Sequence, residues 1–144
     1  MTQTEGAGDF DFLHGSWRVD HRRLKERLAD CDQWEQFGGS MECRPVLGGL
    51  GNVDDNLIEL PAGAYRAVTI RWFDPTEKRW TIHWIDGRTP ALDAPMIGSF
   101  RDGVGTFFGD DELRGRPVMI RFLWDRITES SARWQQAFAW PGSD

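Results

Sequence analysis

Two alternating runs of hydrophobic residues, separated by a short polar segment, dominate the pattern along this chain. Residues 65–73 and 80–86 are rich in β-branched and aromatic side chains, which is typical of two strands joined in a β-hairpin. A three-residue loop with Lys78 in the left-handed conformation would close the hairpin and place Pro75 opposite Arg79. We expect the fold to be organised around this hairpin.

The predicted register sorts the side chains of the hairpin into two faces. It places Trp72 opposite Ile82 and assigns Trp84 to the same face, which we expect to be buried. A shift of one residue would mix the two faces, so burial should enforce the pairing. The face predicted to be interior carries Val68, Ile70, Trp72, Trp80, Ile82 and Trp84, and the opposite face carries Ala67, Thr69, Arg71, Thr81 and His83.

Shorter alternating runs predict strands along most of the remaining chain. Gly38 and Gly39 predict a bend or bulge inside the second strand. The predicted strands span residues 17–22, 34–46, 52–60, 96–101, 104–108, 118–125 and 133–140.

The connections are marked by glycine, proline and polar residues. Asp102 and Gly103 predict a two-residue hairpin turn. We expect longer loops at residues 86–95 and 109–117. Residues 24–28 are charged and fit a helix or a strand equally well.

Together these elements predict an all-β fold. Residues 10–13 are interpreted as a short helical turn that plugs one end of the core. Short strands with short connections predict antiparallel pairing, and the persistent alternation of apolar and charged faces favours an up-and-down β-barrel over a sandwich. No repeat or linker is evident, so residues 1–144 are interpreted as one domain.

The charge balance and the cysteines narrow the class of protein. The net charge is −6 and the pI is about 5.0, which argues against a nucleic-acid partner. Residues 1–8 lack the features of a signal peptide, and no apolar run is long enough to predict a membrane span. Cys31 and Cys43 match neither a disulfide framework nor a zinc motif, so we expect reduced thiols in a cytoplasmic protein.

Aromatic residues are the unusual part of the composition, with eight tryptophans and nine phenylalanines. Such rings fill cores, and they also line pockets for flat apolar ligands, so a filled barrel and a ligand cavity remain equal alternatives. Arg23 and Arg88 lie near a predicted mouth, where they could hold an anionic group. The predicted interior side chains are Trp72, Trp84, Phe122, Trp124, Trp134 and Phe138, with His21, Gln136 and Asp86 as polar neighbours.

One motif adds a resemblance to this interpretation. The sequence Phe-Leu-His-Gly-Ser-Trp at residues 12–17 resembles the Gly-x-Trp opening of lipocalin-like barrels. With Leu-Gly-Gly at 47–49, Arg-Trp-Phe-Asp-Pro at 71–75 and Arg-Trp-Gln-Gln-Ala-Phe at 133–138, the chain resembles an uncharacterised bacterial family of calycin type. The resemblance implies an up-and-down barrel with a central apolar cavity and implies no known reaction.

The resemblance also implies a further strand after residues 136–138, which this sequence does not show. The barrel would then either close without that strand or keep an open edge. An open edge could pair with a second copy of the chain to form a homodimer.

The function favoured by these features is the binding of a small hydrophobic or aromatic molecule, without a cofactor. One alternative is a cofactor-independent isomerase, cyclase or hydrolase, with His21 as acid or base and Arg23 or Gln136 as a polar anchor. A second alternative is a haem-binding barrel with His21 or His83 as the axial ligand.

Other polar groups are interpreted without a catalytic role. The three histidines lack the close spacing of metal ligands, so no metal site is predicted. The acidic pairs at residues 54–55 and 110–111 are interpreted as loop carboxylates that face water.

Overall fold

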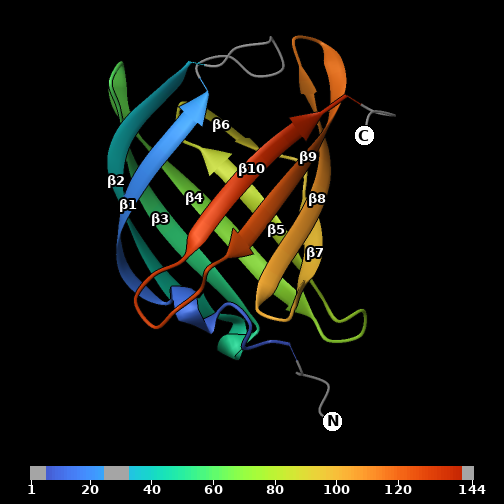
Figure 1. The fold of residues 1–144 in the computed structure, drawn as a ribbon. Helices are drawn as coiled ribbons and strands as arrows, with labels where there is room; N and C mark the ends of the chain where they lie inside the picture. The colour runs from blue at the N-terminus through green and yellow to red at the C-terminus, as the bar shows by residue number, and fades with distance from the viewer. Residues whose placement is uncertain (1–5, 25–32, 141–144) are drawn as a thin grey trace.

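The computed structural model describes residues 6–24 and 33–140, and all ten strands in these ranges belong to one antiparallel sheet. The sheet follows the order β1-β2-β3-β4-β5-β7-β8-β9-β10, and β6 pairs only with β5. It curls strongly into a half-barrel (Figure 1), which confirms the predicted all-β, up-and-down architecture. The strands are β1 (Gly15–Leu24), β2 (Trp34–Val46), β3 (Gly51–Leu60), β4 (Gly63–Asp74), β5 (Arg79–Asp86), β6 (Thr89–Leu92), β7 (Met96–Arg101), β8 (Val104–Leu113), β9 (Arg116–Asp125) and β10 (Arg133–Ala139).

The two ends of the sheet are β1 and β10. They run in the same direction in Figure 1, and no pairing joins them among the described residues. Their common direction follows from the strand count, because nine antiparallel strands remain in the path once β6 is set aside. The first and last members of an odd antiparallel series must be parallel.

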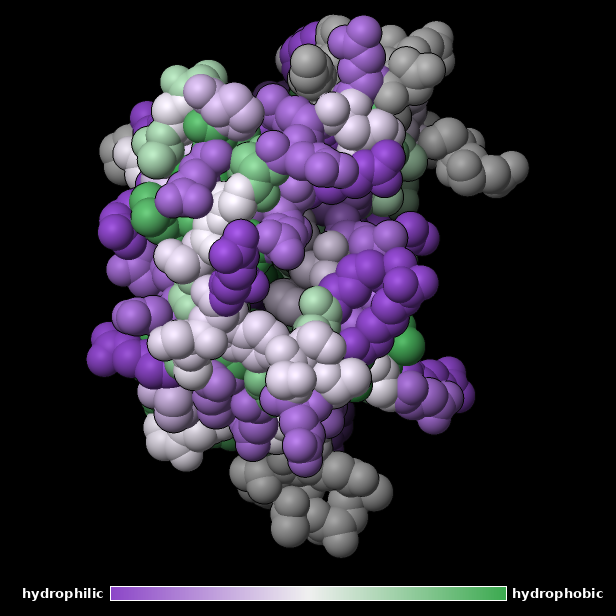
Figure 2. Space-filling view, turned by 60° about the vertical axis from the view of Figure 1, so that its left-hand side comes forward, coloured by the Kyte–Doolittle hydropathy of each residue, from purple (hydrophilic) through white to green (hydrophobic). Residues whose placement is uncertain are grey.

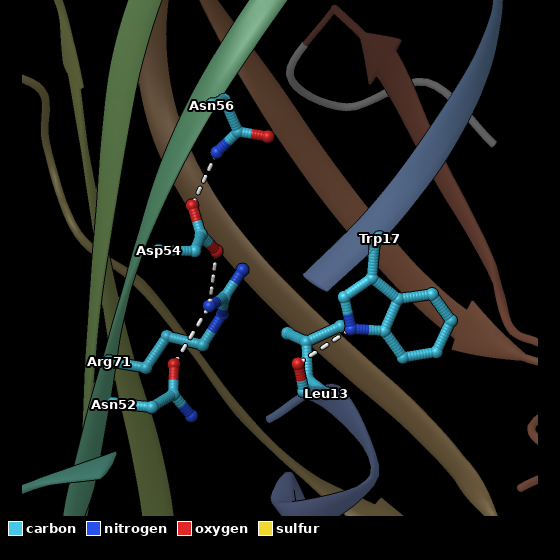
Figure 3. Close-up of polar contacts among 6 residues, drawn as sticks. All are labelled: Leu13, Trp17, Asn52, Asp54, Asn56 and Arg71. Atoms are coloured by element: carbon cyan, nitrogen blue, oxygen red, sulfur yellow. Dashed lines mark hydrogen bonds and ion pairs between the residues drawn. The ribbon is translucent and has the colours of Figure 1, made fainter. Parts of the chain in front are cut away.

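A short helical turn, η1 (Asp11–Leu13), closes one end of the half-barrel, as predicted. Phe10 and Leu13 are buried in the core, with exposures of 0% and 1%. The ring of Phe10 makes edge-to-face contacts with Trp80 at 4.9 Å and Phe100 at 4.8 Å. Trp17 of the Gly-x-Trp motif donates a hydrogen bond from Nε1 to the Leu13 carbonyl (2.7 Å), which ties this plug to β1 (Figure 3).

The organising hairpin is present as β4 and β5, but its register differs by one residue from the prediction. Asp74 pairs with Arg79, so the loop has four residues, and Lys78 has the expected left-handed conformation (φ 57°). The Asp74 carboxylate accepts hydrogen bonds from the backbone N–H groups of Thr76 (2.9 Å) and Glu77 (3.2 Å). This turn chemistry stabilises the longer loop and thereby sets the register.

The extra loop residue reverses the predicted faces of β4. Arg71 pairs with Ile82 and Thr69 pairs with Trp84, so Arg71 and Thr69 face the interior. The prediction that Trp72 lines the interior is therefore wrong, since its ring lies on the convex side. For β5 the predicted face is correct. The buried members of these two strands are Ala67, Thr69, Arg71, Phe73, Trp80 and Ile82.

Two predicted loops are shorter than expected. Within residues 86–95, β6 adds a short strand beside β5. Within residues 109–117, β8 and β9 stay paired up to a two-residue turn at Arg114 and Gly115, with φ values of 52° and 77°. The predicted turn at 102–103 is confirmed.

The paired glycines of β2 produce no bulge, because the register on both sides of the strand is continuous. Gly39 instead allows a close approach. A Cβ atom there would lie 2.5 Å from the Leu57 carbonyl oxygen and 3.3 Å from His21 Nε2. β1 extends to Leu24, whereas residues 25–28 and Cys31 lie outside the described residues.

Polar side chains dominate the outer surface in the view of Figure 2, and apolar side chains are scattered among them. Among the described residues, no helix is long and apolar enough to span a membrane.

Candidate functional site

At the plugged end, the concave side of the sheet is filled by side chains. Trp124, predicted to line a cavity, belongs to this packed floor and contacts the Phe10 ring edge-to-face at 6.1 Å. These rings leave little room beside them, so the filled alternative holds for this half of the interior. The buried members of the floor are Phe10, Leu13, Phe73, Trp80, Phe107 and Trp124.

Part of the opposite half of the concave side is accessible, although inward-facing residues such as Ile58, Ala67 and Ile120 are buried there. Trp84 lies opposite Thr69, and Gln136 lies opposite Phe122, so their side chains share the inward face. They nevertheless remain half-buried or exposed. Inward-facing side chains that stay accessible indicate that solvent reaches this part of the interior. We call these residues the open half: His21, Phe37, Trp84, Phe122, Gln136 and Phe138.

A chain of four polar residues lies inside the half-barrel, and we call it the polar chain (Figure 3). Arg71 Nη1 lies 2.6 Å from Asp54 Oδ2 and donates a hydrogen bond to Asn52 Oδ1 (2.8 Å). Asn56 Nδ2 donates to the other oxygen of Asp54. All four residues are buried, with exposures between 1% for Asp54 and 8% for Asn56.

The polar chain separates the aromatic floor from the open half. The Arg71 guanidinium lies 5.2 Å from the Phe10 ring centroid and 5.9 Å from that of Trp124, so one side of it faces the floor. Asp54 offsets its charge, which makes the pair neutral as a whole. Asn56 is the most exposed member, and its carbonyl oxygen points away from Asp54 (Figure 3).

The polar chain is not predicted by the hydrophobic pattern of the sequence. The predictions of Arg71 on the outer face and of Asp54 as a loop carboxylate are wrong, since both side chains are buried in the interior. Asp55, by contrast, is exposed as predicted. The sequence of β3 does carry a signal for the polar chain. Asn52, Asp54 and Asn56 occupy every second position, which places their side chains on the same face of the strand.

His21 faces the open half and stacks on the Phe37 ring at 4.9 Å. Burial lowers the pKa of the imidazole, the nearby Arg23 lowers it further, and Asp20 partly opposes this shift. The neutral form is therefore favoured at pH 7, so His21 can donate and accept hydrogen bonds there. Arg23 itself is paired with Glu35 (3.2 Å).

Stability should depend on pH through His21. Because its folded pKa lies below the reference value of 6.5, its contribution is present above that pH and is lost as the pH falls. We expect the decrease in unfolding free energy between pH 7.5 and pH 5 to be smaller in His21→Gln than in the unmodified chain. Urea unfolding at both pH values measures this, with His14→Gln as the control. An equal decrease in the unfolding free energy of the unmodified chain and of His21→Gln would contradict this role of His21.

At the rim of the open half, the predicted anion-binding groups are already engaged. Arg88 binds Asp86 through Nη2 (2.7 Å) and Nε (3.1 Å), and its guanidinium stacks on the Tyr65 ring at 3.6 Å. The hydrogen bond from Arg88 is the main cause that lowers the pKa of Asp86. Because Arg88 is already paired with Asp86, its charge is not free to bind an anion.

Trp72 and His83 lie away from the open half. Trp72 stacks on His83 at 5.2 Å on the convex side, and His83 Nδ1 lies 3.0 Å from the Asp93 carbonyl oxygen. Of the two histidines considered as haem ligands, only His21 faces the interior. Trp134 faces inward at the edge strand β10, but it is 41% exposed and packs edge-to-face on Phe122 at 5.1 Å.

Cys43 is a buried thiol close to the polar chain. Burial raises its pKa to about 11. At pH 8 we therefore expect Ellman's reagent to react with it about a hundredfold more slowly in the folded protein than in urea. The measurement uses a Cys31→Ser background, so that the reaction with the reagent reports on Cys43 alone. Equal rates in the two states would contradict the buried position.

Two measured hollows lie outside the open half. One shallow hollow of about 430 Å³ lies beside the plug, between Phe12, Phe100 and Ile127, and another of about 270 Å³ lies against β1, β2, β3 and β4. Within residues 6–24 and 33–140, no group of three His, Cys, Asp or Glu side chains could hold a metal ion.

Taken together, the geometry gives an accessible aromatic surface above a neutral, buried polar chain. No protein-family model matches this chain, and no curated protein is significantly similar to it.

Proposed function

We propose that the open half binds a small, largely apolar or aromatic molecule. The single observation that carries this proposal is the division of the interior: side chains fill the plugged end, whereas inward-facing rings at the other end remain accessible. An accessible concave surface lined by aromatic side chains and a few polar groups is typical of small-molecule sites. Membership of the lipocalin-like calycin barrels, indicated by the Gly-x-Trp motif, is part of the same proposal.

The charges favour a neutral ligand with one or two hydrogen-bonding groups. Arg71 is offset by Asp54, and the rim guanidinium of Arg88 is bound by Asp86. The neutral His21 and the Asn56 carboxamide remain to contact polar atoms of a ligand. Trp84 and Phe122 provide ring surfaces for its apolar part.

A fluorescence titration tests the proposal with the neutral apolar probe N-phenylnaphthylamine. We expect saturable binding that quenches tryptophan emission. Trp84→Phe should weaken binding by about two- to tenfold, because loss of an aromatic contact is worth about 0.5–1.5 kcal/mol. Trp72→Phe is the matched control, since Trp72 lies on the convex side, and it should leave the affinity unchanged.

Two results would contradict this function. One is the absence of saturable binding with this probe and with a panel of flat apolar compounds. The other is an equal loss of affinity in Trp72→Phe and Trp84→Phe.

Acid–base catalysis in the same site is a second candidate, supported by the neutral imidazole of His21 in the open half. For any compound that the protein turns over, His21→Gln should then abolish turnover and retain most of the binding affinity. Equal turnover in the presence and absence of His21 would exclude this role.

A further inference from the structure

We propose that Asn56 makes the open half selective for an apolar or aromatic molecule that carries an N–H or O–H donor. The inference rests on the proposed binding function and adds the chemical class of the ligand. Three observations carry it: the order of donors and acceptors along the polar chain, the neighbours of Asn56, and its position relative to Trp84.

The polar chain fixes the orientation of the Asn56 carboxamide. A guanidinium has only donors, and a carboxylate has only acceptors. Arg71 Nη1 lies 2.6 Å from Asp54 Oδ2, and Asn56 Nδ2 donates to the other oxygen of the same carboxylate. Turning the amide over would place its carbonyl oxygen against a carboxylate oxygen, with no proton between the two acceptors. The Asn56 carbonyl oxygen therefore points away from Asp54 (Figure 3).

This carbonyl oxygen has no donor of its own. Among the described residues, the Asn56 side chain makes a hydrogen bond only through its amide nitrogen. Asn56 is only 8% exposed, yet its carbonyl oxygen is not fully enclosed. A nearly buried acceptor that is open on one side and unpartnered favours a bound molecule that supplies the missing donor.

The neighbours of Asn56 on the inner face are apolar. Its cross-strand partners are Met41 on β2 and Ala67 on β4, and Ile58 follows on the same face of β3. All three are buried and offer no side-chain donor. Trp17, which pairs with Met41, already uses its indole N–H in the bond to the plug. In these apolar surroundings a hydrogen bond to the Asn56 oxygen is stronger than in water, and a ligand without a donor forgoes it.

The position of Asn56 suits a ligand that also contacts Trp84. Trp84 on β5 pairs with Thr69 on β4, and Thr69 pairs with Asp54, the inward neighbour of Asn56 on β3. The two residues are thus two strand spacings apart, about 10 Å. A bicyclic aromatic molecule with a hydrogen bond at one end spans such a distance. Its rings can contact Trp84 while its N–H or O–H group donates to Asn56.

The test compares indole with benzofuran, which has the same size and shape but an oxygen in place of the N–H group. Both are measured on the full chain by displacement of N-phenylnaphthylamine. We expect indole to bind about three- to tenfold more tightly than benzofuran, the effect of one hydrogen bond. In Asn56→Leu the two compounds should bind equally, with the affinity for benzofuran retained.

Asn52→Leu is the matched control variant. Asn52 is the other carboxamide of the polar chain, but its oxygen already accepts the hydrogen bond from Arg71, and the residue is only 1% exposed. Indole should therefore keep its preference over benzofuran in this variant. An equal loss of preference in both variants would assign the effect to a disturbed polar chain and overturn the role of Asn56. A preference that persists in Asn56→Leu would overturn it as well.

The outcomes separate this inference from the proposed function. If indole and benzofuran displace the probe equally well from the unmodified chain, the open half binds apolar molecules without selection by Asn56. That result overturns the inference alone, and it does not depend on the folding of any variant. If neither the two compounds nor the probe binds, the proposed function is wrong, and the inference is wrong with it.

Discussion

Replacing Arg71 by alanine is expected to lower the free energy of unfolding by about 3–5 kcal/mol. The substitution leaves the Asp54 carboxylate buried without its cation, 2.6 Å from where the guanidinium was. It also removes the donor to Asn52 and the charge above the Phe10 ring. Urea unfolding at pH 7, followed by far-ultraviolet circular dichroism, measures the effect.

The control for this prediction removes both charges. In the double variant Arg71→Met with Asp54→Leu, no charge is buried, so we expect most of the lost stability to return. The outcome distinguishes a penalty for an unpaired charge from a simple loss of packing. If Arg71→Ala changed stability by less than about 1 kcal/mol, the interior position of Arg71 would be wrong, since exposed residues tolerate such changes.

Phe10→Ala is expected to destabilise the protein by about 3–5 kcal/mol, because it leaves a cavity at the centre of the aromatic floor. Phe10 has no exposed surface, and its ring contacts Trp80 and Phe100 within 5 Å. Phe108→Ala is the matched control. Phe108 is 55% exposed on the outer side, so we expect a change within about 0.5 kcal/mol.

Thermal and urea unfolding of the two phenylalanine variants compare the stability lost in the plugged core with that lost on the outer surface. Similar losses for both would mean that the helical turn does not plug the barrel. We also expect Phe10→Ala to shift the tryptophan emission to longer wavelength, because Trp80 and Trp124 would meet water.

The sequence was sufficient to predict the all-β class, the plug and most strands, because each depends on local pattern. Alternation defined β2 and β7 to the residue, and Asp-Gly marked the turn at 102–103. The turn at 114–115 was missed because its first residue is an arginine in the left-handed conformation, which carries no such signal.

The interior of β4 could not be predicted from the strand alone. Its outer face carries Val68, Ile70 and Trp72, which are more hydrophobic than Thr69 and Arg71 on the inner face. Arg71 is stabilised inside only because β3 brings Asp54 beside it. Arg71 and Asp54 are far apart in the sequence, so the pattern of β4 alone does not reveal their pairing. A single extra residue in the loop between β4 and β5 also decides which face of β4 points inward.

The most direct test of the binding account is an NMR structure-mapping experiment with bound N-phenylnaphthylamine. Side chains at neighbouring positions of a strand point to opposite sides of the sheet, so they report the bound side without ambiguity. The account predicts nuclear Overhauser contacts from the probe to the rings of Trp84 and Phe122, and none to the methyl groups of Ile85 and Leu123. Contacts to Ile85 and Leu123 instead would place the ligand on the convex surface and contradict an interior site.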